Sequence, residues 1–154
     1  MKDETKVVTT NRKAFHEYHI LERFEAGLNL VGSEVKSLRE GRANLKDSYA
    51  VIREGEVFLV GMHIGPYSHT GYSGHESYRE RKLLLNRQEI RKLNRSVSNK
   101  GNTIVPLSVY FKGGWAKVEI ALAKGKHTYD KRKSLVEKDR KREMERELKE
   151  KKVI

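Results

Sequence analysis

The sequence has no cysteine, only two prolines and no long apolar run among its 154 residues. The absence of cysteine excludes disulfide bonds and thiolate metal sites, and it fits a reducing compartment. No apolar segment approaches the roughly 20 residues that span a bilayer. Residues 1–6 are mostly charged and are not followed by the apolar stretch of a secretory signal. We therefore expect a cytoplasmic protein.

Positive charge is abundant. Lys and Arg number 33 against 21 Asp and Glu, which gives a net charge of +12 and a sequence pI near 9.9. Such a surplus predicts a polyanionic partner, because each phosphate that a basic side chain neutralises releases a bound counterion. Nucleic acid is the partner we expect, and an anionic membrane surface is the alternative.

The composition changes near Lys124 and divides the chain in two. Residues 1–123 contain apolar residues at strand and helix spacings, whereas residues 124–154 carry 13 basic and 7 acidic side chains and few apolar ones. We predict one domain over 1–123 and a basic tail over 124–154 that cannot bury a core of its own. Three Glu to Lys pairs four residues apart favour a helix in the tail, and like-charge pairs oppose it. We expect the free tail to be coil or partial helix, and a solvated extension is the alternative.

The first part predicts a mostly β fold. Strands are predicted over residues 18–24, 49–53, 57–60, 104–111 and 115–122. Ser33 and Asn86 are expected to cap two helices, which end at Gly41 and Ser98. Gly27 predicts a bend or bulge, Pro106 predicts a bulge or an edge position, and residues 65–78 predict a loop. The fold expected is a small, oligonucleotide-binding-like antiparallel barrel with two or three short helices and a C-terminal tail that is disordered or helical.

The sequence gives no support for catalysis, a metal or a cofactor. His16 and His19 are three residues apart, whereas a zinc-protease helix needs four. His63, His69 and His75 have no carboxylate cluster at ligand spacing, so we expect them near RNA or solvent. Residues 71–74 place Ser73 between glycines without the spacing of a nucleophile elbow. The alternative is a metal-dependent nuclease that uses His63, His69 or His75.

Basic side chains gather around the second predicted helix, downstream of several tyrosines. They are Arg79, Arg81, Lys82, Arg87, Arg91, Lys92 and Arg95, and the tyrosines are Tyr67, Tyr72 and Tyr78. Basic groups with interleaved aromatics suit RNA backbone and unstacked bases. An ordinary charged helix face is the alternative, and the net charge favours RNA.

Several short strings in a fixed order resemble the small protein B family. They are Asn-Arg-Lys-Ala at 11–14, His-Glu-Tyr at 16–18, Phe-Glu-Ala-Gly at 24–27, Gly-Ser-Glu-Val-Lys-Ser-Leu-Arg at 32–39, Asp-Ser-Tyr at 47–49, Arg-Lys-Leu-Leu-Leu-Asn at 81–86, Ala-Lys-Gly-Lys at 123–126 and Asp-Lys-Arg at 130–132. The resemblance implies a non-enzymatic barrel that binds the tRNA-like domain of transfer-messenger RNA (tmRNA) and delivers it to stalled ribosomes in trans-translation. It also implies a tail that becomes helical as it probes the empty mRNA channel and the decoding centre of the small subunit.

The resemblance implies partners and site residues as well. The partners are tmRNA, the ribosome, and alanyl-tRNA synthetase and elongation factor Tu through charged tmRNA, with no membrane partner and no cofactor. The RNA-binding positions it implies are Asn11, Arg12, Lys13, His16, Glu25, Lys36, Leu84, Lys117 and Lys124. The tail positions expected at the decoding centre are Gly125, Lys126, Tyr129, Asp130, Lys131, Arg132, Lys133, Arg140 and Lys141. Tyr129 stands where the family can have a histidine, and we hypothesise that it stacks on a nucleobase. A ribosomal protein or general RNA-binding module is the rival interpretation.

Overall fold

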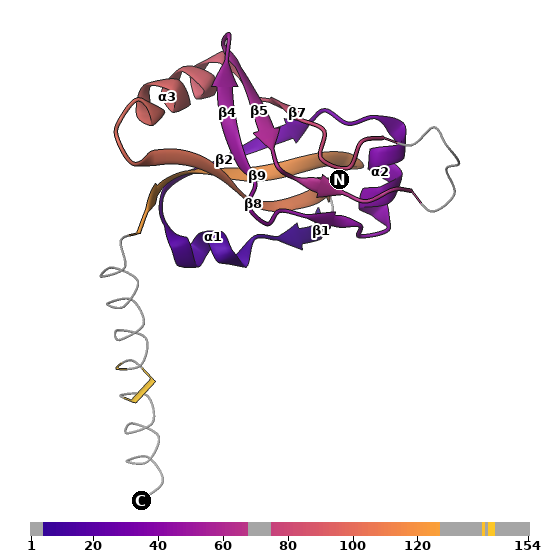
Figure 1. Cartoon of the computed structure of the whole chain (residues 1–154), viewed down its shortest axis with the longest axis horizontal. Helices are drawn as coiled ribbons and strands as arrows, with labels where there is room; N and C mark the ends of the chain where they lie inside the picture. The colour runs from indigo at the N-terminus through magenta and orange to yellow at the C-terminus, as the bar shows by residue number, and fades with distance from the viewer. Residues whose placement is uncertain (1–4, 68–74, 127–139, 141, 144–154) are drawn as a thin grey trace, which may run out of the picture.

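In the computed structural model, the described part of the chain comprises residues 5–67 and 75–126 together with residues 140, 142 and 143. The elements in chain order are β1 (Thr5–Thr10), α1 (Arg12–Glu17), β2 (Tyr18–Leu28), α2 (Gly32–Arg39), β3 (Ala43–Asn44), β4 (Tyr49–Arg53), β5 (Glu56–Val60), β6 (His63–Ile64), β7 (Arg81–Leu84), α3 (Arg87–Val97), β8 (Asn102–Lys112) and β9 (Trp115–Gly125) (Figure 1). Within these residues, no helix is both long and apolar enough to cross a membrane.

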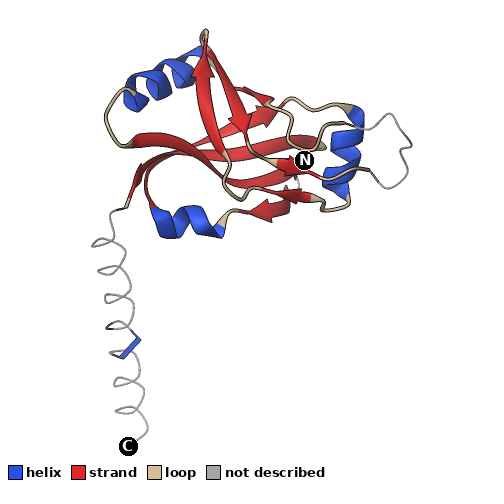
Figure 2. Ribbon diagram, viewed as in Figure 1, coloured by secondary structure: helices blue, strands red, loops and turns tan. Residues whose placement is uncertain are grey.

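Six strands close into a barrel. They pair in the order β8, β4, β5, β7, β2 and β9, and β9 pairs back onto β8 along almost its whole length. Each of these pairings is antiparallel. The contact between β4 and β8 is the shortest, since it consists of the single pair Ala50 and Ile104. β1 runs antiparallel to the second half of β8, outside the ring. The prediction of a small, mostly β antiparallel barrel with short helices is confirmed (Figure 2).

The core follows the two-residue alternation of the strands. Val118, Ile120 and Leu122 of β9 point into the barrel, as predicted, and Leu38 of α2 and Leu93 of α3 are buried in the same cluster. β8 and β9 also bury their outer faces near α1, where Ala14 packs against Val105, Leu107, Ala121 and Ala123. Because of this second cluster, α1 is fixed on the outside of β8 and β9.

The two predicted helices form, with one change of cap. Asn86 accepts a hydrogen bond from the Glu89 N–H at 2.9 Å, and the Glu89 carboxylate accepts one from the Asn86 N–H at 3.2 Å, so the predicted capping box is confirmed. The Ser33 cap is wrong, since α2 already begins at Gly32 and its N-cap is Val31. The Glu34 carboxylate accepts a hydrogen bond from the Val31 N–H at 3.0 Å.

Of the two bulges predicted at Pro106 and Gly27, only the one at Pro106 is present. The register between β8 and β9 shifts between Pro106 and Ser108, so Pro106 lies at a bulge and not at an edge. Gly27 is not a bulge, because it pairs in register with Leu84 on one side and Lys117 on the other. The irregularity of β2 lies between Ile20 and Glu22 instead.

The histidines of the described residues differ in their surroundings. His16 is in α1 and His19 is in β2, so the pair spans a junction between helix and strand. The His75 ring lies between the Ser33 hydroxyl (2.8 Å) and the Ile64 carbonyl oxygen (2.9 Å), so it links α2 to β6, and its expected place near RNA or solvent stays a prediction. Because the carbonyl can only accept, Nε2 of His75 is the donor. His63 packs its ring against that of Tyr78, and His69 lies outside the described residues.

A buried ion pair joins α2 to β7. Arg81 and Glu34 are both fully buried, and Nε of Arg81 donates to Oε2 of Glu34 at 2.5 Å. Arg79 donates to the other Glu34 oxygen at 2.6 Å, and Nη1 of Arg81 donates to the Met62 carbonyl oxygen at 2.6 Å. The expectation that Arg81 belongs to an RNA-facing basic cluster is therefore wrong, since its side chain is fully buried against Glu34. The Arg79 side chain is 37% exposed, so its place in that cluster stays a prediction.

Candidate nucleic-acid interface

A row of side chains crosses four neighbouring strands on the outside of the barrel. Leu84 of β7 pairs with Gly27 of β2, Gly27 pairs with Lys117 of β9, and Lys117 pairs with Tyr110 of β8. Cross-strand neighbours are about 4.5–5.5 Å apart, so the row is roughly 15 Å long. Three predicted positions, Glu25, Leu84 and Lys117, thus lie on one surface. We define this surface as the outer face: Glu25, Leu84, Tyr110, Lys112 and Lys117.

Gly27 lets Leu84 lie close to β2. A Cβ atom at position 27 would be 3.2 Å from the Leu84 Cβ, which is tighter than ordinary contact. The Leu84 side chain is still 54% exposed, although its neighbour Leu83 is buried. The question of which leucine in the run 83–85 points outward is thereby answered, because Leu85 also packs partly against the core.

Glu25 is the carboxylate at the centre of the outer face. Its Oε2 accepts a hydrogen bond from the Tyr110 hydroxyl at 2.6 Å and lies 3.5 Å from Nζ of Lys112. The hydrogen bond from Tyr110 and the positive charges of Lys112 and Lys117 hold the pKa of Glu25 below its usual value. The side chain is 41% exposed. An ionised carboxylate held in this way can accept hydrogen bonds from an exocyclic amine or a ribose hydroxyl.

Tyr110 and Lys112 were missed by sequence reasoning. Burial and the nearby Glu25 carboxylate raise the pKa of the Tyr110 phenol, so it stays protonated and remains a donor. The two-residue alternation of β8 could have placed Tyr110 and Lys112 on one face. Nothing local could have placed that face against Glu25, which is 85 residues away from Tyr110.

Trp115 adds an exposed aromatic ring next to this surface. It is the only tryptophan of the chain, it is 74% exposed, and it starts β9 two residues before Lys117. Residues two apart in a strand share a face, so Trp115 and Lys117 point to the same side of the sheet. An exposed indole there can stack on an unpaired base.

The predicted residues of α1 form a second group. Asn11 anchors the start of α1, because its Nδ2 donates to the Pro106 carbonyl oxygen at 2.9 Å. Arg12 and His16 are exposed, whereas Lys13 lies 3.3 Å from Asp47 and 3.7 Å from Glu17. The hydrogen bond and negative charge of Asp47, with the charge of Glu17, raise the pKa of Lys13.

Arg23 connects the two groups. Its guanidinium lies 5.5 Å from the centre of the Phe15 ring of α1, and its Nη1 is 3.3 Å from Oε1 of Glu119. Glu119 pairs with Glu25 across β9 and β2. The exposed part of α1 and the outer face are therefore neighbours on one side of the barrel.

Two predicted residues lie elsewhere. Lys36 of α2 places its Nζ 5.4 Å from the centre of the Tyr67 ring. Lys124 is exposed near the end of β9, seven residues from Lys117, which is about 23 Å at 3.3 Å per residue. The nine predicted RNA-binding positions therefore do not form a single cluster, and their role in RNA binding stays a prediction.

Few of the predicted tail positions fall in the described residues. Gly125 ends β9 and pairs with Tyr18, and the N–H of Lys126 donates to the Glu17 carbonyl oxygen at 2.8 Å. Arg140 is helical and exposed. The other predicted positions, Tyr129, Asp130, Lys131, Arg132, Lys133 and Lys141, lie outside the described residues. β9 runs two residues past the predicted boundary at 123, and the division into body and tail stays a prediction.

No group of three or more potential metal-ligating side chains occurs in the described ranges 5–67 and 75–126 or at residues 140, 142 and 143. Surfaces built from a carboxylate, lysines, a leucine and an exposed aromatic ring are suited to binding and orienting a nucleic acid. A model of the family described as "SmpB protein" matches residues 8–150. The chain belongs to the SmpB family.

Relatives confirm the membership. A protein of Syntrophobacter fumaroxidans named SsrA-binding protein is 55% identical over 144 residues, which are 94% of this chain and 89% of the relative. A protein of Sulfurihydrogenibium sp. with the same name is 60% identical over 144 residues, which are 94% of this chain and 95% of the relative. The resemblance to the small protein B family seen in the short strings is thus confirmed.

A solved SmpB structure supports the fold. The chain described as "tmRNA-SmpB: a journey to the center of the bacterial ribosome" superposes with a TM-score of 0.67 and is 43% identical in sequence. The match covers 82% of this chain and 93% of the solved one.

Proposed function

We propose that this SmpB family member binds the tRNA-like domain of tmRNA and delivers it to stalled ribosomes in trans-translation. The observation that carries the proposal is family membership over residues 8–150, with relatives named SsrA-binding protein at 55% and 60% identity. The mechanism is binding and accommodation without catalysis. Its partners are tmRNA and the ribosome, and charged tmRNA connects it to alanyl-tRNA synthetase and elongation factor Tu.

The outer face supports RNA binding in chemical terms. Lys117 and Lys112 supply positive charge, Glu25 supplies acceptors that stay ionised, and Leu84 supplies an exposed apolar contact. A carboxylate inside a basic surface disfavours non-selective phosphate binding, because it repels the backbone unless a base or ribose donor faces it. This combination favours a structured RNA over a general polyanion.

The basic tail is proposed to probe the empty mRNA channel and the decoding centre. A broken message leaves that channel vacant and lined by phosphates, and residues 124–154 carry a net charge of +6. Favourable Glu to Lys pairs between residues 137 and 151 support folding of the tail into a helix once the channel phosphates screen its repulsion.

The binding step is tested by titrating labelled tRNA-like domain with the full chain at several salt concentrations. An ordinary transfer RNA and a ribosomal RNA fragment of matched length serve as competitors. Selective binding of the tRNA-like domain supports the proposal. Equal affinities for all three RNAs would favour a general RNA-binding module instead.

The tail step needs its own test. A chain that ends after Arg132 is expected to bind tmRNA normally and to abolish tagging of stalled peptides in a reconstituted translation system. Loss of binding and tagging together would contradict the proposed division between body and tail.

A further inference from the structure

α3 exposes three arginines on one face. Arg87, Arg91 and Arg95 are four residues apart, all three are exposed, and the opposite face buries Leu93 against the core. Residues four apart follow one another at about 6 Å along a helix, so the three form a continuous line. We call this line, Arg87, Arg91 and Arg95, the arginine ridge.

The ridge has no charge compensation among residues 5–67 and 75–126. Neighbouring lysines, by contrast, are paired with carboxylates. Nζ of Lys92 lies 2.5 Å from Oε1 of Glu22, and Nζ of Lys82 lies 2.8 Å from Oε1 of Glu56. The carboxylate of Glu89, the acidic residue of the helix, accepts a hydrogen bond from the Asn86 N–H at the helix cap. No such ion pair is found for the ridge arginines within the described chain. Like charges four apart destabilise a helix, so the ridge carries a cost that no ion pair within the described residues offsets.

A groove runs beside the ridge. One hollow of about 310 Å³ is lined by Gly55, Arg87, Ile90, Arg91 and Asn94. A second hollow of about 590 Å³ shares Gly55, Arg87 and Ile90 with the first and extends to Leu84. The tight turn between β4 and β5 forms the opposite wall, where Glu54 and Gly55 both have positive φ.

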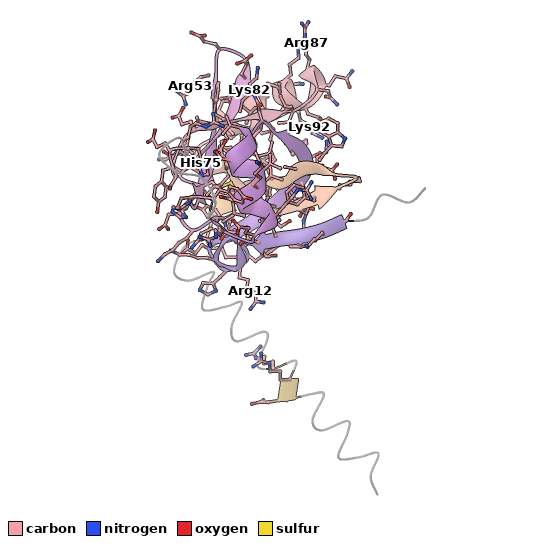
Figure 3. All side chains as sticks on the ribbon, turned by 90° about the vertical axis from the view of Figure 1, so that its right-hand side faces the viewer. Arg12, Arg53, His75, Lys82, Arg87 and Lys92 are labelled. Atoms are coloured by element: carbon pink, nitrogen blue, oxygen red, sulfur yellow. The ribbon has the colours of Figure 1, made fainter. Side chains whose placement is uncertain are left out.

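The groove connects the ridge to the outer face. Leu84 belongs to both, because it pairs with Gly27 on the outer face and lines the second hollow. Only two residues separate Leu84 from Arg87. The ridge lies on the opposite side of the barrel from α1, as the positions of Arg87 and Arg12 in Figure 3 show.

We infer that the arginine ridge is a phosphate-binding extension of the RNA interface, along which the backbone of the tRNA-like domain continues past Leu84. This inference rests on the proposed function. Guanidinium groups fit phosphates because their planar fork donates two parallel hydrogen bonds. Glu54 on the far wall repels phosphates, whereas Glu56 there is paired with Lys82, so the backbone runs on the ridge side and its sugars or bases face the wall.

The test compares two variants that lose the same amount of charge. The ridge variant replaces its three arginines by Gln, which keeps the helix propensity. The control variant replaces three basic residues that are already paired with carboxylates: Arg42 with Glu40, Arg53 with Glu80 and Lys92 with Glu22. Affinity for the tRNA-like domain is measured for the wild type and both variants between about 0.05 and 0.3 M salt. Circular dichroism and thermal unfolding check that each variant is folded.

For the ridge variant, the slope of log affinity against log salt is expected to be shallower by roughly 2 to 3. Each phosphate contact contributes about 0.9 to this slope on duplex DNA, and we apply the same value to duplex RNA. Affinity at low salt should fall roughly tenfold or more. The control variant should lose less than one unit of slope. Equal slopes for the two variants would overturn the inference while leaving tmRNA binding intact. So would a ridge variant that binds tmRNA normally and loses only ribosome association. If the wild type itself does not bind the tRNA-like domain, the proposed function fails instead.

Discussion

The phenol of Tyr110 donates a hydrogen bond to the carboxylate of Glu25 across the outside of the barrel, at 2.6 Å. The contact joins β8 to β2 over the intervening β9, because Tyr110 pairs with Lys117 and Glu25 pairs with Glu119. It holds the carboxylate in one orientation, keeps its pKa low, and leaves its other oxygen available to a ligand. The first prediction depends on this orientation.

Glu25→Gln is expected to weaken binding of the tRNA-like domain by roughly ten- to hundredfold. The reason is that a hydrogen bond to a charged group contributes about 1.5–3 kcal/mol, and 1.4 kcal/mol is a factor of ten in affinity. Tyr110→Phe keeps the carboxylate and loses its orientation, so a smaller loss is expected. Isothermal titration of both variants measures the difference. If Glu25→Gln bound RNA like the wild type, Glu25 would be a structural residue only.

The buried pair of Glu34 and Arg81 predicts a large effect on stability. Glu34→Gln is expected to lower the free energy of unfolding by about 3–5 kcal/mol, because it leaves Arg81 buried without a countercharge. The matched control is Glu56→Gln, which breaks the exposed pair with Lys82 and should cost less than about 1 kcal/mol. Urea unfolding followed by circular dichroism compares the two. Equal losses would show that the burial of the pair is energetically unimportant.

Acid should destabilise the barrel through its carboxylates. Burial raises the pKa of Glu34, but hydrogen bonds from Arg79, the Val31 N–H and Arg81 outweigh it, so the folded pKa lies below the usual value. The pKa of Glu25 is lowered too. A carboxylate with a depressed folded pKa contributes stability above its unfolded pKa, near 4.3, and that stability is lost as pH falls through the folded value. The free energy of unfolding should therefore decline as pH drops below about 5. In Glu25→Gln this decline should be shallower, and an identical pH profile would contradict the assigned shift.

The parts of the fold that the sequence predicts are those with local signals. The capping box at Asn86 and the alternation in β9 involve residues a few positions apart, and both are present in the structure. β7 was not predicted, because it is four residues long and begins with two charged ones. Its Arg81 is neutralised by Glu34, 47 residues earlier in the chain, which no local pattern reveals.

The candidate site likewise depends on contacts between residues that are far apart in the sequence. Glu25, Leu84 and Lys117 were identified only through the resemblance to a family, since an exposed leucine and a glutamate in a strand have no distinctive local signal. Their adjacency depends on the register of β7, β2 and β9, which the closure of the barrel sets. Tyr110 and Lys112 became site residues only when that register was known.

Trp115 provides a direct optical test of where RNA lies on the barrel. As the only tryptophan of the chain, it reports on one place, and its indole is largely exposed on the same side of β9 as Lys117. Adding the tRNA-like domain is expected to quench its fluorescence with the same midpoint as binding. Trp115→Ala should lose about 1–3 kcal/mol of binding free energy, the contribution of one stacked base, whereas Trp115→Phe should retain most of it because it keeps an aromatic face. Saturated binding with unchanged fluorescence would place the RNA away from this end of the outer face, and equal affinities of the Ala and Phe variants would exclude stacking.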